Sequence, residues 1–158
     1  MKKITGILAA TMVIVIITSF KPAIDEVPFP EGYRSWNHVK SGILGPNHPN
    51  VQYRGFNHVY ANDIAMKGFT SGTFPEGTIL IMDVIESVPV NENFTGEGKR
   101  HHMDVIQKDS IKFKETGGWG YAQFESDNSR RMLTIDQKKT CFNCHLKQKD
   151  HVFSELRK

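Results

Sequence analysis

The chain has 158 residues, enough for one domain and a short extension, and its 39% hydrophobic and 23% charged residues are typical of a globular protein. Lys and Arg number 20 and Asp and Glu 17, which gives a formal net charge of +3 at pH 7. The basic residues form no long cluster, so the composition excludes a nucleic-acid-binding protein that relies on a basic patch.

The N-terminal residues 1–20 have the pattern of an export signal. Lys2 and Lys3 precede an uncharged apolar stretch at 4–20. A basic start followed by an apolar run is typical of a secretory signal peptide. No small-x-small cleavage triplet precedes Lys21, so an N-terminal membrane anchor is the alternative, at the short limit for a spanning helix. We therefore predict a periplasmic or otherwise exported protein.

The rest of the chain is predicted to form a linker and one domain. Residues 21–30 are rich in proline and acidic residues, which is typical of a linker or an extended lead-in. Residues 31–158 contain no internal repeat and no low-complexity tract. They are numerous enough for one hydrophobic core, so we predict a single domain there.

Runs of β-branched and aromatic residues predict five strands, at 33–39, 53–60, 78–85, 100–107 and 119–125. The 78–85 segment is apolar on both faces and is expected to be central. Residues 119–125 alternate in a way that predicts a half-buried strand. Gly, Pro and Asn predict loops at 41–50 and 91–98.

The predicted helices are short. Asn62 and Asp63 are good N-caps for a helix that ends near Gly68. One helical turn is expected within 108–115, and residues 129–148, which lack Gly and Pro, are predicted to be mostly helical. Strands followed by a C-terminal helical segment predict an α+β fold, with an antiparallel β-sheet packed with short helices.

Both cysteines of the chain lie in one motif, Cys141-Phe142-Asn143-Cys144-His145, on the predicted C-terminal helical segment. C-x-x-C-H is the signature of covalent haem attachment. Residues three apart share one face of a helical turn, so both thiols can reach the vinyl groups at one porphyrin edge. His145 then presents an imidazole nitrogen to the iron. One motif predicts one covalent haem c, attached through Cys141 and Cys144 with His145 as iron ligand.

Three other interpretations of the cysteines stay open at this point. A structural zinc site needs four ligands, and histidines such as His151, at an awkward spacing, would have to complete it. A redox dithiol is expected near a βαβ pattern, which the predicted strands do not form. A disulfide between Cys141 and Cys144 is permitted in an exported protein. The histidine directly after the second cysteine favours haem.

Six segments resemble the cytochrome P460 family, which includes the cytochrome c′-beta proteins. They are GYRSW at 32–36, HVYAN at 58–62, GTFPEGT at 72–78, TGGWGY at 116–121, CFNCH at 141–145 and DHVFS at 150–154. The resemblance implies an antiparallel sheet packed with helices, a homodimer, and a haem beside the sheet. It also implies a five-coordinate iron with a proximal histidine and an open distal face. Members of the family oxidise hydroxylamine or bind nitric oxide and related small ligands.

One position departs from the enzymes of that family. The hydroxylamine-oxidising members carry a lysine, cross-linked to the porphyrin, on the strand after the FPEGT turn, and the resemblance places Met82 there. No lysine lies between Lys67 and Lys99. A thioether cannot form an amine–porphyrin bond, so the cross-link is expected to be absent. The resemblance therefore favours binding of a small ligand, with a hydroxylamine or peroxide oxidoreductase as the alternative.

Further residues are candidates for the haem pocket. Met82 can fill the core, line the haem edge or serve as a sixth iron ligand. Asp104 falls near an acidic residue that the enzyme members use on the distal side, where a carboxylate can relay protons; the alternative is a surface acid. His101 and His102 should point to opposite faces of a strand. A simple electron carrier would need a sixth ligand from Met82, His101, His102 or Met103.

Partners follow from the same considerations. Arg100, Arg130 and Arg131 are candidates to pair with haem propionates, with a solvated charge as the alternative for each. The predicted partners are a small gaseous or nitrogenous ligand and a redox partner protein. Nucleic acid is not expected.

Overall fold

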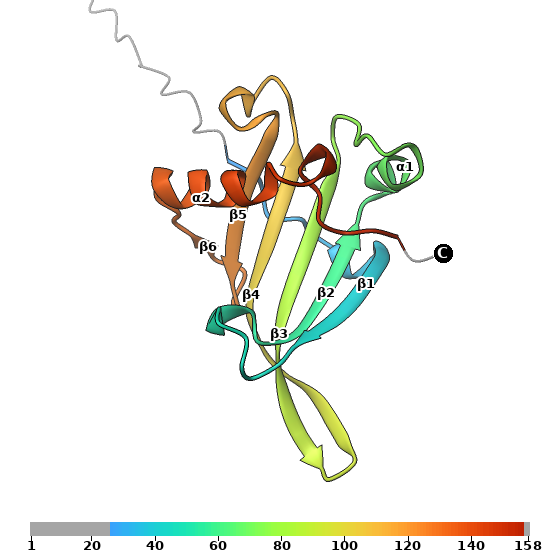
Figure 1. Cartoon of the computed structure of the whole chain (residues 1–158), viewed down its shortest axis with the longest axis vertical. Helices are drawn as coiled ribbons and strands as arrows, with labels where there is room; N and C mark the ends of the chain where they lie inside the picture. The colour runs from blue at the N-terminus through green and yellow to red at the C-terminus, as the bar shows by residue number, and fades with distance from the viewer. Residues whose placement is uncertain (1–25, 157–158) are drawn as a thin grey trace, which may run out of the picture.

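The computed structural model describes residues 26–156, so the predicted signal segment lies outside the described residues. This range forms a six-stranded antiparallel sheet whose strand order follows the chain (Figure 1). The strands are β1 (Asn37–Leu44), β2 (Gly55–Ala61), β3 (Ile79–Asn91), β4 (Phe94–Lys108), β5 (Trp119–Glu125) and β6 (Arg130–Arg131). The helices are α1 (Asp63–Ser71) and α2 (Ile135–His145), with 3-10 turns η1 (Tyr33–Ser35), η2 (Val51–Tyr53), η3 (Lys114–Thr116) and η4 (Lys149–His151). The predicted α+β class is confirmed.

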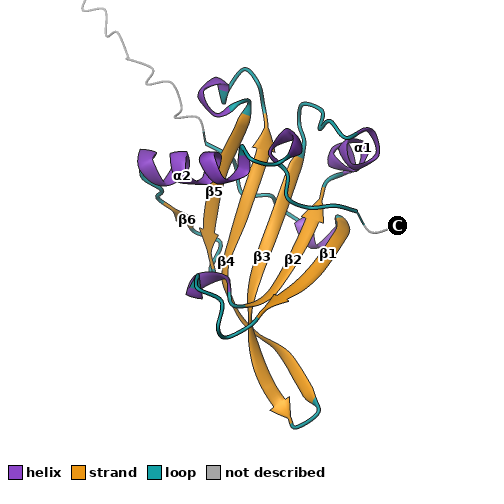
Figure 2. Cartoon of the chain, viewed as in Figure 1, coloured by secondary structure: helices purple, strands orange, loops and turns teal. Residues whose placement is uncertain are grey.

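The two faces of the sheet are covered by different parts of the chain (Figure 2). On one face α1, α2 and the C-terminal segment pack over Val59, Leu80 and Tyr121. On the other face the N-terminal segment, with Val27 only 1% exposed, packs over the central strands. Within residues 26–156, neither helix combines the length and the apolar character needed to cross a membrane.

This double cover corrects the prediction for residues 119–125. The predicted bounds of this strand match β5, but the strand is buried at every position except Glu125 rather than half-buried. Its Trp119 and Tyr121 belong to the core beneath the helices, whereas Ala122 and Phe124 pack beneath the N-terminal segment. Side chains of β5 do alternate between the two faces of the sheet, but other parts of the chain cover both faces, so neither is exposed to solvent.

Several predicted boundaries on the strands were wrong. Tyr33–Ser35 is a 3-10 turn, and β1 continues to Leu44 into the predicted loop 41–50. The predicted loop 91–98 is mostly strand, because β3 and β4 pair as far as Asn91 and Phe94 and form a ribbon that projects beyond the sheet (Figure 1). The Asn and Gly residues there mark a tight turn and a ribbon strand rather than a long loop.

The helix boundaries also differ from the predictions. Residues 130 and 131 pair with β5 as β6, and α2 begins only at Ile135 because Thr134 caps it in a capping box with Gln137. Helix α1 runs past Gly68 to Ser71, and Gly72, with a left-handed φ of 79°, caps its last turn. Position 68 requires glycine because the Phe74 ring occupies the space that a Cβ would need.

Candidate haem site

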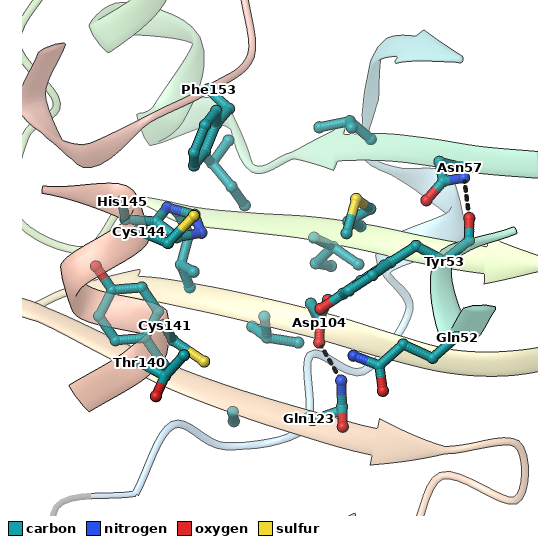
Figure 3. A pocket seen from close by; sticks show the side chains of 18 of the residues that line it. Gln52, Tyr53, Asn57, Asp104, Gln123, Thr140, Cys141, Cys144, His145 and Phe153 are labelled. Atoms are coloured by element: carbon teal, nitrogen blue, oxygen red, sulfur yellow. Dashed lines mark hydrogen bonds between the residues drawn. The ribbon is translucent and has the colours of Figure 1, made fainter. Parts of the chain in front are cut away.

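A cavity of about 610 Å³ lies between the sheet and α2 (Figure 3). Its floor is a row of cross-strand neighbours, one from each of the strands β2 to β6: Val59, Met82, Asp104, Gln123 and Arg131. Paired residues of adjacent antiparallel strands point to the same face, so the strand register alone aligns them. The volume is within the range of cofactor-binding sites.

The last turns of α2 form one end of the cavity. Cys141, Cys144 and His145 all line it, as does Thr140. Cys141 is partly buried, Cys144 is exposed, and both thiols are free. Burial raises the pKa of Cys141, and the Asp104 carboxylate acts in the same direction. The spacing that the sequence motif predicted is therefore realised on one helical turn, with its side chains at a single cavity wall.

His145 is held in one defined orientation. Its Nδ1 lies 2.7 Å from the backbone carbonyl oxygen of His151. A carbonyl can only accept, so Nδ1 carries the proton and Nε2 keeps its lone pair for a metal. Burial lowers the pKa of His145, outweighing that hydrogen bond and Asp104, which act to raise it. The rings of Tyr121 and Phe153 pack edge-on against the imidazole at 5.2 and 4.9 Å.

The other end of the cavity is polar. Figure 3 shows Gln52 and Tyr53 of η2 there, with the Tyr53 hydroxyl facing Asp104. Asp104 accepts a hydrogen bond from Gln123 Nε2 at 2.7 Å, and Gln123 in turn accepts one from Arg131. Burial, followed by the Asp104 carboxylate, raises the pKa of Tyr53, so its hydroxyl keeps its proton. This end thus presents a held carboxylate beside a phenol donor.

The structure separates the residues considered as a sixth iron ligand. Met82 lines the cavity and is the direct cross-strand neighbour of Asp104. His101 is exposed, whereas His102 is 1% exposed and packs 5.1 Å from the Tyr53 ring, with Nε2 3.6 Å from Asp104 Oδ2. Met103 is buried on the opposite face of the sheet. Met82 is the member of this set that borders the cavity.

The three arginines considered as partners of the haem propionates lie on different faces of the sheet. Arg131 lines the cavity at β6, where it donates to Glu125 and Gln123. Arg100 forms an ion pair with Asp83 at 3.0 Å on the opposite face of the sheet. Arg130 lies over the Phe124 ring at 4.9 Å and donates to the Val27 carbonyl, also on that face. Arg100 and Arg130 therefore have partners away from the cavity.

Sequence reasoning missed part of the polar end. Gln123 was recoverable, because alternation along β5 puts it on the same face as Tyr121. Tyr53 was assigned to a strand, and nothing local indicated that it ends a 3-10 turn whose hydroxyl reaches the cavity. Phe153 likewise reaches His145 only through the path of the C-terminal segment.

The residues present fit a c-type haem. Two free thiols and one imidazole with an available nitrogen stand at the wall of a cavity lined by Val59, Leu80 and Ile106. Within residues 26–156 no cluster of three or more His, Cys, Asp or Glu side chains is arranged to hold a metal ion, so the second ligand pair of a zinc site is not found there.

Comparison with known proteins agrees with this geometry. A family model described as Cytochrome P460 matches residues 30–154. The chain belongs to the cytochrome P460 family. Membership in this cytochrome family implies that the chain binds haem, and the matched range contains every residue that lines the cavity. A search of the curated proteins found no match.

Proposed function

We propose that this cytochrome P460 family member is an exported monohaem cytochrome c that binds nitric oxide or a similar small ligand at an iron ligated by His145. One observation carries the proposal. At the cavity wall beside two free thiols, the Nδ1 of His145 is already bonded to a backbone carbonyl, so Nε2 is the nitrogen left to bind iron.

The residues of the chain have distinct roles in this proposal. Cys141 and Cys144 would hold the haem by adding their thiols across its two vinyl groups, which forms two thioether bonds. The bound group supplies an iron with a coordination position for the small ligand. Val59, Leu80 and Ile106 exclude water from the cavity, and Arg131, which already donates to Glu125 and Gln123, is the candidate arginine that borders it.

The residues opposite α2 favour an open coordination position. No imidazole lines the cavity among the described residues apart from that of His145. The family resemblance puts Met82 in the place of the cross-linking lysine, and its neighbour Asp104 is held by Gln123 rather than free to swing toward a metal. Asp104 and the Tyr53 hydroxyl are placed to hydrogen-bond a small polar ligand.

The decisive experiment is maturation of the full chain in a host that attaches haem c. Haem should stay on the denatured protein in a gel, and the double variant Cys141→Ala, Cys144→Ala should lose it. The ferrous holoprotein should be high-spin and should take up carbon monoxide and nitric oxide at once.

Met82→Leu serves as the matched control for the ligand set. Leu fills a similar volume without a sulfur, so the ferrous spectrum should not change. A low-spin haem that resists carbon monoxide in the natural protein and becomes reactive in Met82→Leu would show that Met82 is a sixth ligand and that the protein is an electron carrier. A denatured chain without bound haem would contradict the proposal altogether.

Three further features implied by the resemblance and the N-terminal pattern stay predictions. Export rests on residues 1–20, which lie outside the described residues. The homodimer rests on the family resemblance alone, and the redox partner protein is an expectation for a cytochrome.

A further inference from the structure

The carbonyl that contacts His145 belongs to a strained turn. Asp150 and His151 in η4 have φ values of 44° and 60°, in the left-handed region that residues with a Cβ avoid. Such conformations cost about 1 kcal/mol or more per residue and persist only where surrounding contacts impose them. Two in succession therefore need specific anchors.

Asp150 supplies the first anchor. Its carboxylate accepts from Lys108 Nζ at 2.7 Å and from the backbone N–H of Phe74 at 2.6 Å, and the Trp119 indole N–H lies at 3.5 Å. These donors come from the end of β4, the turn before β3 and the start of β5. Burial alone would raise the pKa of Asp150, but these donors outweigh it and hold the pKa below its ordinary value. A charged, partly buried group thus ties the turn to the sheet.

The ring of His151 supplies the second anchor. It stacks on Phe142 of α2 with ring centres 5.6 Å apart and planes 19° apart. A Cβ at Gly117 would lie 3.0 Å from two atoms of the ring, so the glycine leaves room for the ring in this position. With both the carboxylate and the ring held, the His151 carbonyl is directed at Nδ1 of His145.

We propose that Asp150 is a positioning residue that, through the η4 turn, sets the strength of the His151–His145 hydrogen bond and so tunes the iron ligand. The inference rests on the proposed ligation by His145. A carbonyl bonded to Nδ1–H makes the imidazole a more basic ligand, which favours the oxidised metal. The anchors of η4 therefore act on the reduction potential without touching the haem.

The test compares three holoprotein variants. Asp150→Asn removes the charge of the anchor, and Lys108→Met removes its strongest donor. Glu155→Gln, at an exposed acid of the same C-terminal segment, is the matched charge control. We expect a higher midpoint potential and a lower iron–histidine stretching frequency in the first two variants, with no change in either quantity for Glu155→Gln.

Opposite charge changes separate positioning from simple electrostatics. Losing a negative charge near the haem raises the potential, whereas losing the positive charge of Lys108 should lower it. Only a role through the η4 turn predicts that Asp150→Asn and Lys108→Met both raise the midpoint potential and both weaken the iron–histidine bond. Potentials that move in opposite directions, or a stretching frequency unchanged in both variants, would overturn the inference.

Two measurements keep this result separate from the proposed function. If His145→Ala keeps the spectrum of the natural protein, ligation by His145 itself is wrong. If His145 is the ligand and haem is attached, unchanged Asp150→Asn and Lys108→Met proteins refute only the positioning role. Gly117→Ala adds a Cβ that presses on the His151 ring, so it should move the potential and the frequency as Asp150→Asn does, and it replaces that variant if the latter does not accumulate.

Discussion

At the scale of single residues, Met82 and Asp104, which the sequence analysis treated separately, are neighbours in the cavity. Met82 and Asp104 are direct cross-strand partners, so the position that the resemblance assigns to the cross-linking lysine and the candidate acid–base group lie side by side. The carboxylate is held by Gln123 and faces a protonated Tyr53. This neighbourhood is compatible with ligand binding and also with the alternative of hydroxylamine oxidation.

Substitution of Asp104 distinguishes these two functions. Asp104→Asn keeps the shape of the side chain and its contact with Gln123 but removes the proton-accepting charge. We expect the haem content, the ferrous spectrum and any slow hydroxylamine oxidation to stay as in the natural protein, measured by steady-state turnover. A general acid–base group contributes about 100-fold or more, so a loss of that size would establish Asp104 as catalytic and favour the enzyme.

At the scale of elements, β6 and α2 depend on contacts that local patterns did not reveal. Arg131 makes a two-pronged ion pair with Glu125 across the β5–β6 turn, and it also donates to Gln123 in the cavity floor. The two-residue strand therefore positions the chain that leads to the capping residue Thr134 and the cysteine motif. The prediction of helix from 129 onward was wrong because residues 130 and 131 turn back to pair with β5, so that the helix begins only after Thr134.

The Glu125–Arg131 pair should make stability depend on pH. Hydrogen bonds from Arg131 lower the pKa of Glu125 below its ordinary value. Its contribution is therefore complete above the ordinary Glu pKa and is lost as pH falls through the lower, folded value. Because the pair is exposed, Glu125→Gln should reduce the free energy of unfolding by only about 0.5 kcal/mol at neutral pH. Urea unfolding should show that the difference in the free energy of unfolding between the natural protein and Glu125→Gln vanishes in acid. A difference that does not change with pH would contradict the contribution of this ion pair.

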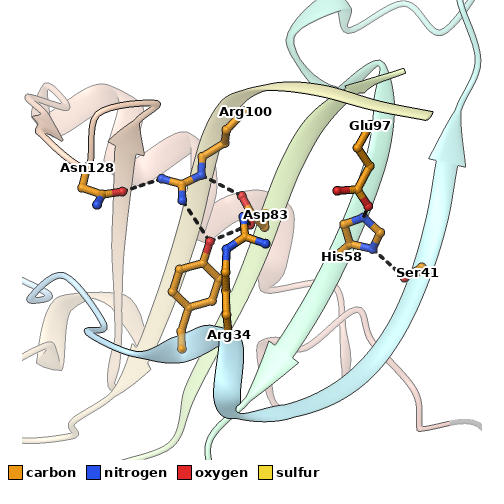
Figure 4. A network of polar contacts seen from close by, with 8 residues as sticks. Arg34, Ser41, His58, Asp83, Glu97, Arg100 and Asn128 are labelled. Carbon is orange, nitrogen blue, oxygen red and sulfur yellow. Dashed lines mark hydrogen bonds and ion pairs between the residues drawn. The ribbon is translucent and has the colours of Figure 1, made fainter. Parts of the chain in front are cut away.

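At the scale of the whole molecule, the sheet has the cavity on one side and a polar network on the other, and Figure 4 shows that network. There the fully buried Asp83 accepts from Tyr33 at 2.6 Å and from Arg34 at 2.8 Å, and it pairs with Arg100 at 3.0 Å. Burial, with the Asp83 hydrogen bond, raises the pKa of Tyr33 to about 12. This network ties the N-terminal segment to β3 and β4.

The two sides should respond independently to mutation. Asp83→Asn leaves the largely buried Arg100 without its charge partner, so we expect a loss of about 3 kcal/mol in the free energy of unfolding. The ferrous spectrum and ligand uptake should not change, because Asp83 points away from the cavity. Glu97→Gln, which breaks the exposed pair with His58, is the control and should cost less than about 1 kcal/mol. A spectral change in Asp83→Asn would show that the two sides are coupled.

Features that depend only on neighbouring residues could be predicted from the amino-acid sequence. The spacing of Cys141, Cys144 and His145 is a property of one helical turn, and the α+β class and the bounds of β5 follow from local residue patterns. Tertiary structure decided which residues meet. Cavity partners are set by strand register, and Asp150 contacts Phe74, 76 positions away, and Lys108, 42 positions away. Contacts at that separation depend on how the chain packs, which no local pattern records.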